Sequence, residues 1–310
     1  MIRINKKRPF SPANSVRVNQ IATEVDRIYR THSNLKKLRD MIASGTMTEE
    51  LYDFINMDGS LEHLLLGLPR PSDEISCEAL QAQQLEIIDA QLEGLVQEFK
   101  NILARWWDAL KEWFLDWWDL NRSIRFRLNA KLSQFNLNPT TLGNVDRFEA
   151  AQGNVYHKPY WARMCIACTE LNKIMLNIPT NDLSKWVASN VPKINQCIGE
   201  FGQYIESTDN RFNIPKLVKP KYDQTLTTLG AARWRVQLLG TDIKTAVDIL
   251  GNEIEFRKTF SNLESAFKNA SIEDKNALSF LRQLTMRAKT DCLVVGRGIE
   301  RVLSVFAKTK

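Results

Sequence analysis

Residues 103–120 read LARWWDALKEWFLDWWDL and hold five of the eight tryptophans of this 310-residue chain. Written as a helix, the stretch places its apolar residues three and four positions apart, on one broad stripe: Leu103, Trp106, Trp107, Leu110, Trp113, Phe114, Trp117 and Trp118. Charged residues fill the opposite face: Arg105, Asp108, Lys111, Glu112, Asp116 and Asp119. The pattern predicts an amphipathic helix.

The five tryptophans (Trp106, Trp107, Trp113, Trp117 and Trp118) form a stripe that must be covered, because burying them removes about 1000 Å² from water. An apolar patch of that size does not stay exposed on a soluble monomer. We interpret the stripe as core, covered by other helices of the same chain, and keep a groove on a partner protein as the alternative. Membrane insertion and base stacking are less favoured, because the polar face of this helix is rich in acids.

The composition is that of a globular protein, with 44% apolar and 25% charged residues. The net charge of +6 is uneven: residues 1–78 hold 11 basic and 11 acidic residues, so the whole excess lies in the rest of the chain. Five cysteines, an odd number, favour a reducing compartment over a disulfide framework. No uncharged apolar run of 18 residues occurs, so we expect no integral membrane association.

Apolar residues elsewhere also recur at helical spacing, and strand alternation of useful length does not occur. Near the N-terminus one stripe comprises Ile21, Val25, Ile28, Leu35, Leu38, Met41 and Ile42. Pro69 and Pro71 then impose an extended stretch. After Glu78 helical spacing continues to about residue 135. The prolines therefore mark the clearest boundary in the chain.

These patterns predict an all-α fold with three parts. A separate N-terminal helical segment occupies residues 1–78, and a long amphipathic Trp-rich helix occupies residues 79–135. A helical body at residues 136–310 forms a multi-helix bundle. Within the body, Ser271 is the expected N-cap of a helix, because acids follow it in the first turn.

Directly after the tryptophans, residues 121–132 read NRSIRFRLNAKL and contain four basic residues and no acid. Arg122 and Arg125 lie on one side of a helix, and Arg127 and Lys131 lie four residues apart on another. These four are the candidate polyanion-binding residues. Contact with DNA through them would be sequence-independent and would weaken as salt rises, because it depends on counterion release. A solvated helix face is the alternative.

The chain offers little for catalysis. Its three histidines, His32, His63 and His157, stand in no metal motif and beside no candidate nucleophile. Cys165 and Cys168 form a CxxC, but no second pair stands at zinc-like spacing, so two core cysteines are the better interpretation. We expect no enzyme activity, no catalytic residues, no metal site and no cofactor.

Taken in order, these features resemble a known family, the internal head proteins of large tailed bacteriophages, which are structural proteins of the inner capsid. The matching stretches are LEHLLLGLPRPSDEISCEAL, LVQEFKNILARWWDALKEWFLDWWDL, NRSIRFRLNAKL, FNLNPTTL and CLVVGRGIERVLSVFAKTK. The resemblance implies a virion component that is made in the host cytoplasm and packaged inside the capsid with the genome. Its implied partners are capsid-interior proteins and packaged DNA, the latter through nonspecific contact.

The resemblance also implies a propeptide, which a phage maturation protease removes inside the prohead by cutting after Glu in a small-residue–x–Glu motif. Residues 72–74 (SDE) and 76–78 (SCE) match this motif at the proline-marked boundary, so Glu74 and Glu78 are the candidate cleavage positions. Residues 22–24 (ATE) match it too, but on a predicted helix. The alternative is that Glu74 and Glu78 only complement the dipole of the helix that follows them.

Two other functional classes stay open. One is a non-viral helical protein–protein interaction module that uses the Trp-rich helix. The other is a membrane-active helical protein.

Overall fold

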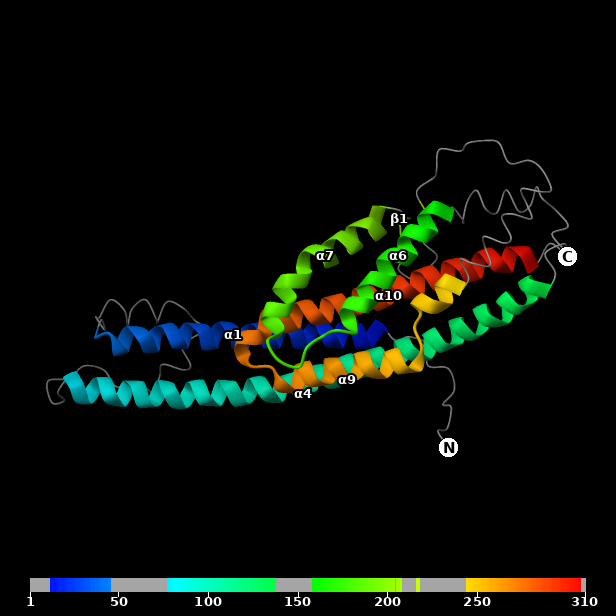
Figure 1. Cartoon of the computed structure of the whole chain (residues 1–310). Helices are drawn as coiled ribbons and strands as arrows, with labels where there is room; N and C mark the ends of the chain where they lie inside the picture. The colour runs from blue at the N-terminus through cyan, green and yellow to red at the C-terminus, as the bar shows by residue number, and fades with distance from the viewer. Residues whose placement is uncertain are drawn as a thin grey trace, which may run out of the picture. The chain divides into compact units, whose positions relative to one another are not determined.

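The computed structural model describes residues 12–45, 77–137, 158–203, 205–207, 216–217 and 244–307. The predicted all-α fold is confirmed for this part of the chain (Figure 1). The principal helices are α1 (Pro12–Ala43), α4 (Cys77–Leu137), α6 (Lys158–Met175), α7 (Leu183–Gln203), α9 (Glu253–Asn269) and α10 (Lys275–Ala307). A short antiparallel pair of strands, β1 (Ile205–Ser207) and β2 (Lys216–Leu217), follows α7.

Helix α4 is the longest element, with 61 residues, and it contains the whole tryptophan stretch. No proline interrupts it, and the helix continues through Gly94, its one glycine. The described part of the chain divides into two compact units inside α4, between Glu112 and Trp113. The three segments expected from the sequence, 1–78, 79–135 and 136–310, stay a prediction.

The first unit, here called the hairpin unit, comprises the described residues of Pro12–Glu112 together with Ala270–Asn276. In this unit α1 runs antiparallel to α4. The order of the ion pairs between the two helices shows this: Arg17 pairs with Glu112, Glu24 with Arg105, Arg27 with Glu98, and Arg39 with Asp89. The Nε1 of Trp106 donates to the backbone oxygen of Val18 at 3.2 Å. The two helices lie side by side in Figure 1.

An apolar seam lies between these two helices. On α1 its buried residues recur every three or four positions: Val18, Ile21, Val25, Ile28, Leu35, Leu38 and Ile42. On α4 the same spacing holds for Leu95, Phe99, Ile102, Trp106 and Ala109. This is the spacing of a two-helix coiled-coil seam. Met41, expected in the α1 stripe, is instead 40% exposed, because it lies at the edge of the stripe that Leu38 and Ile42 define.

Residues 270–276 complete the hairpin unit and lead into α10. Ser271 donates from its backbone nitrogen and its hydroxyl to Asp274 Oδ2, at 3.1 and 3.0 Å, and the 3₁₀ turn Ile272–Asp274 follows. The expected helix start at Ser271 is therefore confirmed. Lys275 pairs with Asp26 of α1 at 2.5 Å, and its Nζ lies 5.2 Å from the centre of the Tyr29 ring.

The second unit, here called the body unit, comprises the described residues of Trp113–Asn269 and Ala277–Lys310. Helix α9 packs on the second half of α4 through stacked rings, with Phe114 and Phe256 at 5.1 Å and Trp118 and Phe256 at 4.3 Å between centroids. Helix α10 approaches from another side, where Trp117 Nε1 donates to the Lys289 oxygen at 2.9 Å. No helix in the described part of the chain is apolar over a length that could cross a membrane.

Replacing Trp106 by Phe should destabilise the hairpin unit by about 1–3 kcal/mol, because it removes a buried hydrogen bond and leaves a void against α1. Trp118→Phe is the matched control, since Trp118 is only half-buried and phenylalanine keeps the stacking on Phe256. Urea titrations followed by circular dichroism measure both variants. Equal shifts of the midpoint in the two would contradict the buried role of Trp106.

Candidate functional site

The five tryptophans of the stripe face the interior of the protein. Trp106, Trp107, Trp113 and Trp117 are 0–6% exposed, and Trp118 is half-buried. The chain thus covers its own stripe: α1 reaches Trp106 in the hairpin unit, and α9 and α10 reach Trp117 and Trp118 in the body unit. The intact chain does not present these rings as a ready-made surface for a partner.

The four basic residues after the stripe separate into two groups with different surroundings. Arg127 forms a two-pronged ion pair with Glu300 of α10, and its Nη1 also donates to Ser123 at 2.6 Å. Lys131, four residues on, is half-buried. On this side of α4 the charge of Arg127 is therefore compensated by Glu300.

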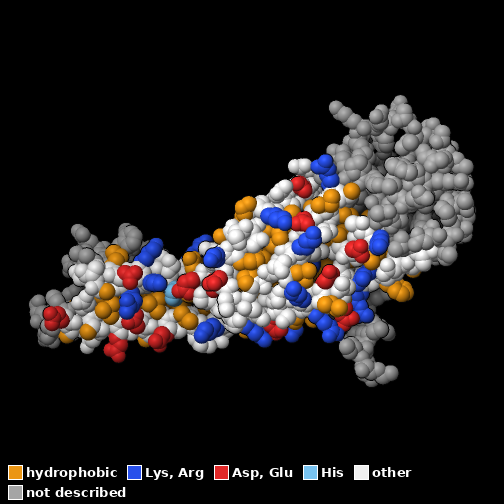
Figure 2. Space-filling model, in the orientation of Figure 1, with side chains coloured by type: hydrophobic (Ala, Val, Ile, Leu, Met, Phe, Trp, Pro, Cys, Tyr) orange, Lys and Arg blue, Asp and Glu red, His pale blue; other side chains and the backbone are white. Residues whose placement is uncertain are grey.

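Arg122 and Arg125 lie on another side of α4. Arg122 is exposed, and no ion pair to it occurs among the described residues. Arg125 is half-buried, and its Nε is buried without a hydrogen-bond partner in the described structure. Phe126, next to them, is 76% exposed. Basic and acidic side chains are mixed over the face shown in Figure 2, so this small group is a local feature.

The candidate cleavage positions have different placements. Glu74 lies outside the described residues. Glu78 is exposed and is the acidic residue in the first turn of α4. Glu24, from the third matching triplet, lies within α1 and its carboxylate pairs with Arg105 at 2.9 Å. Of these two described glutamates, Glu78 stands at a helix end and Glu24 lies inside a helix.

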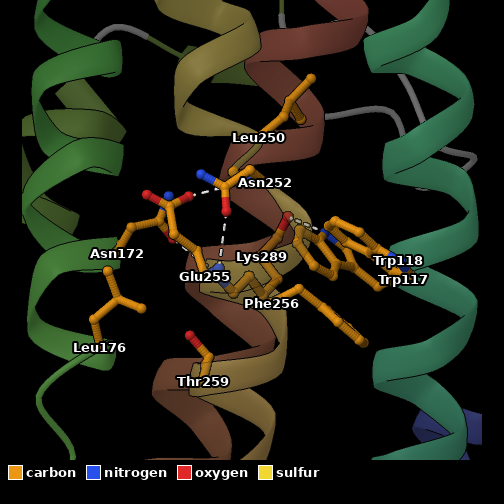
Figure 3. Close-up of a pocket in the computed structure, with 11 residues that line it drawn as sticks. Trp117, Trp118, Asn172, Leu176, Leu250, Asn252, Glu255, Phe256, Thr259 and Lys289 are labelled. Atoms are coloured by element: carbon orange, nitrogen blue, oxygen red, sulfur yellow. Dashed lines mark hydrogen bonds between the residues drawn. The ribbon is translucent and has the colours of Figure 1, made fainter.

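A small cavity in the body unit lies beside a buried lysine (Figure 3). Its volume is about 20 Å³, which is room for one water molecule. Its lining includes Trp117 and Trp118 of α4, Asn172 of α6, Phe256 of α9 and Lys289 of α10. It therefore lies where four helices of the body unit meet.

Lys289 is 7% exposed, and burial lowers the pKa of its amine. Its Nζ donates to Asn172 Oδ1 at 2.9 Å and lies 5.0 Å from the centre of the Trp117 ring. Asn172 Nδ2 in turn donates to the Ile249 oxygen at 2.7 Å and lies 3.6 Å from Cys292 Sγ. Two polar side chains thus connect the cavity to a buried thiol.

Sequence reasoning missed this polar group, although a signal existed. Lys289 and Asp291 sit among residues of α10 that recur at helical spacing and are buried, such as Leu281, Ala288 and Val295. A charged residue at a buried position of a helix is rare unless it has a partner. The partner Asn172 lies 117 positions away, so the sequence alone does not identify it.

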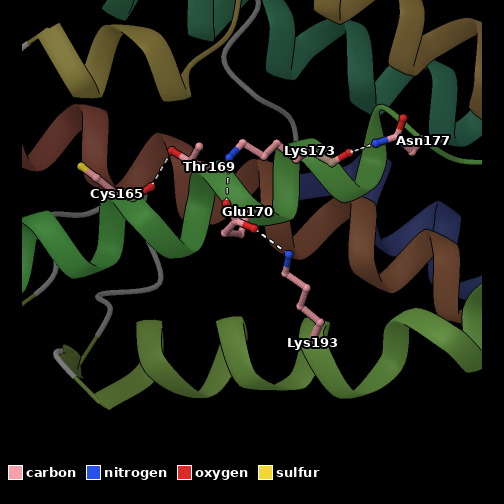
Figure 4. A network of polar contacts seen from close by, with 6 residues as sticks. All are labelled: Cys165, Thr169, Glu170, Lys173, Asn177 and Lys193. Atoms are coloured by element: carbon pink, nitrogen blue, oxygen red, sulfur yellow. Dashed lines mark hydrogen bonds and ion pairs between the residues drawn. The ribbon is translucent and has the colours of Figure 1, made fainter.

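A second polar network joins α6 to α7 (Figure 4). Glu170 accepts from Lys173 at 2.9 Å on its own helix and from Lys193 of α7 at 2.7 Å. These two hydrogen bonds lower the pKa of Glu170 to about 2, and the one from Lys193 has the larger effect. The network faces solvent, with both lysine side chains more than half exposed, and it serves to hold the two helices together.

Cys165 and Cys168 of the CxxC lie in the interior, 2% and 1% exposed, as expected for core cysteines. Within the described ranges, no three His, Cys, Asp or Glu side chains are grouped so that they could hold a metal ion.

The buried carboxyl group of Asp291 makes the stability of the folded protein depend on pH. It is 3% exposed and accepts from Arg287 Nε at 2.9 Å, yet burial outweighs this partner and raises the pKa of Asp291 to about 6. The folded chain therefore holds this proton more tightly than the unfolded chain does. The stability that it contributes is full below about pH 4 and is lost as pH rises through 6, by about 3 kcal/mol.

Asp291→Asn should accordingly flatten the difference in urea midpoint between pH 4 and pH 7 relative to the unchanged chain. Glu170→Gln is the matched control, since the pKa of Glu170 is lowered to about 2 and its contribution is lost as pH falls, which is the opposite sign, so its removal should not flatten the difference. If Asp291→Asn leaves the pH dependence as it was, the carboxyl group is ionised in the folded protein.

No family model, curated protein or solved structure matches this chain.

Proposed function

We propose that this chain is a structural protein of a tailed-phage particle, an internal head protein that carries no catalytic site. It is made in the host cytoplasm, packaged with the genome inside the capsid among other capsid-interior proteins, and cut by the phage maturation protease. The observation that carries the proposal is the pairing of α1 with α4, with one candidate cleavage triplet (72–74) in the connection between them and the second (76–78) at the start of α4.

The geometry of the hairpin unit supports processing at this connection. The segment between α1 and α4 includes Glu74, and Glu78 follows in the exposed first turn of α4. Glu24, which matches the same motif, lies inside a paired helix. A cut after Glu74 or Glu78 would separate α1 from α4 covalently and leave every contact of the seam in place.

The distribution of charge supports contact with packaged DNA through the body of the protein. The chain through Glu78 has no net charge, so the whole +6 stays with the residues that follow. Of the four basic residues after the stripe, Arg127 is paired with Glu300, and no ion pair to Arg122 or Arg125 occurs among the described residues. Phosphate contact through such residues is independent of sequence.

The alternative, a protein–protein interaction module that uses the Trp-rich helix, finds less support. Four of the five rings are buried by the chain itself, so this role requires the covering helices to leave. The membrane-active alternative requires the same exposure.

Processing predicts the N-terminal sequence of the protein in mature particles. A chain that starts at Ile75 or Ala79 should be found, because the protease cuts after Glu74 or Glu78. The triplet at 22–24 is the internal control: no start at Val25 should appear, since Glu24 lies within α1 and pairs with Arg105. Mature particles that contain only the intact chain from Met1, or none of its peptides, contradict the proposal.

If the protein contacts DNA through Arg122 and Arg125, removing their charges should weaken the salt dependence of DNA binding. Arg122→Gln with Arg125→Gln should lower the slope of log affinity against log salt by about 2 on duplex DNA, since each phosphate contact contributes about 0.9. The matched control is Arg127→Gln with Glu300→Gln, which removes an ion pair without changing net charge and should leave the slope unchanged. Equal slopes in the two double variants, measured by fluorescence anisotropy, would exclude the Arg122 face as the contact.

A further inference from the structure

One aromatic ring of α4 is exposed on the surface of the body unit. Phe126 is 76% exposed, whereas the tryptophans that precede it on the same helix are buried or half-buried. Arg122 comes four residues earlier, so the guanidinium and the ring are neighbours on the helix surface, about 6 Å apart along its axis. A single exposed apolar side chain is ordinary on a protein. The side chains around Phe126 therefore decide what it can do.

The neighbours of Phe126 on the outer side of α4 are basic. Arg122 is exposed, Arg125 is half-buried, and no ion pair to either occurs among the described residues. No Asp or Glu occurs in the sequence between Asp119 and Asp146. The ring thus lies beside two guanidinium groups with which no described carboxylate pairs. We call Arg122, Arg125 and Phe126 the Phe126 face.

A second exposed apolar side chain in the body unit has the opposite surroundings. Ile254 of α9 is 79% exposed, but it stands between Glu253 and Glu255. A polyanion is repelled by these two carboxylates and attracted by the two arginines of the Phe126 face. Charge therefore selects an anionic partner for the Phe126 face and excludes the same partner at Ile254.

The rest of the surface around Phe126 favours nucleic acid over an anionic membrane. A helix that lies in a lipid surface buries a broad apolar face. Asn129 and Ser133 continue the outward line of Phe126 along α4, and both are polar and exposed. One ring in such a line gives little apolar area to a membrane. A nucleic acid instead offers phosphates to the arginines and a flat base to the ring.

The ring also distinguishes an unpaired strand from a duplex. In a duplex the bases stack on one another and present only their edges in the grooves. An aromatic side chain reaches a base face there only by wedging a step open, which costs stacking energy. An unpaired strand offers its base faces without this cost, and stacking on an aromatic ring tolerates any sequence.

We propose that the Phe126 face binds single-stranded nucleic acid, with phosphates on Arg122 and Arg125 and one base stacked on Phe126. The two arginines attract any nucleic acid through charge, and the ring adds a preference for an unpaired strand. This preference rests on the DNA contact proposed above and specifies the form of DNA that the contact favours.

Fluorescence anisotropy of the full-length protein with an oligothymidine of about 16 nucleotides, and with a duplex of equal length, tests the preference. Phe126→Ala should weaken oligothymidine binding at least about fivefold, because one stacked base contributes that much. The salt slope and the duplex affinity should stay unchanged, because no charge is removed. Phe126→Trp should keep the affinity, since an indole also stacks.

Ile254→Ala is the matched control and should change neither affinity. Both substituted side chains are exposed, so both variants should fold like the unchanged chain, which circular dichroism verifies. Arg122→Gln with Arg125→Gln should lower the salt slope on oligothymidine by about 1.4, since each phosphate contact on a single strand contributes about 0.7.

The outcomes separate the strand preference from the DNA contact itself. If the unchanged protein binds neither nucleic acid, the contact and the preference fall together. If the double arginine variant lowers the slope while Phe126→Ala leaves oligothymidine binding as it was, the contact stands and the stacking is overturned. If Phe126→Ala instead weakens binding to phosphatidylglycerol vesicles and not to oligothymidine, the Phe126 face belongs to a membrane contact.

Discussion

The organisation of this protein depends on the need to bury the aromatic side chains of one long helix. Helix α4 brings five tryptophans within 13 positions, and each must find a cover. In the hairpin unit the cover is α1, whose seven buried apolar residues follow the seam of α4. In the body unit it is α9 and α10, which stack a ring on Trp118 and accept the indole hydrogen of Trp117. Both compact units are therefore built on the same stripe.

This arrangement changes what a propeptide would mean here. A detachable tail makes few contacts, whereas α1 supplies one side of an apolar seam and four ion pairs with α4. The ion pairs are exposed and each contributes little, so the seam supplies most of the attraction. Cutting the connection and releasing α1 are consequently separate events. The first alters the covalent chain alone, and the second would expose the first half of the tryptophan stripe.

Much of the fold could be predicted because it depends on local patterns. Helical spacing located the α1 stripe and the Trp-rich helix, and Ser271 with its following acids located the start before α10. Met41 was assigned to the stripe wrongly, because spacing alone does not resolve the edge of a helix face. The cavity and its neighbours could not be predicted, since Asn172 and Lys289 meet only through the packing of α6 on α10. The same holds for Arg127, whose partner Glu300 lies 173 positions away.

If α1 covers α4, the amides of both helices are protected by the same packing, which hydrogen–deuterium exchange of the full-length chain measures. An isolated helix of this kind is marginal in water, so protection of its amides reports packing. The account predicts that peptides from residues 18–42 exchange as slowly as those from residues 95–106 and that both lose protection together as urea is added. Rapid exchange across residues 18–42, while residues 95–106 stay protected, would mean that another part of the protein covers the tryptophans.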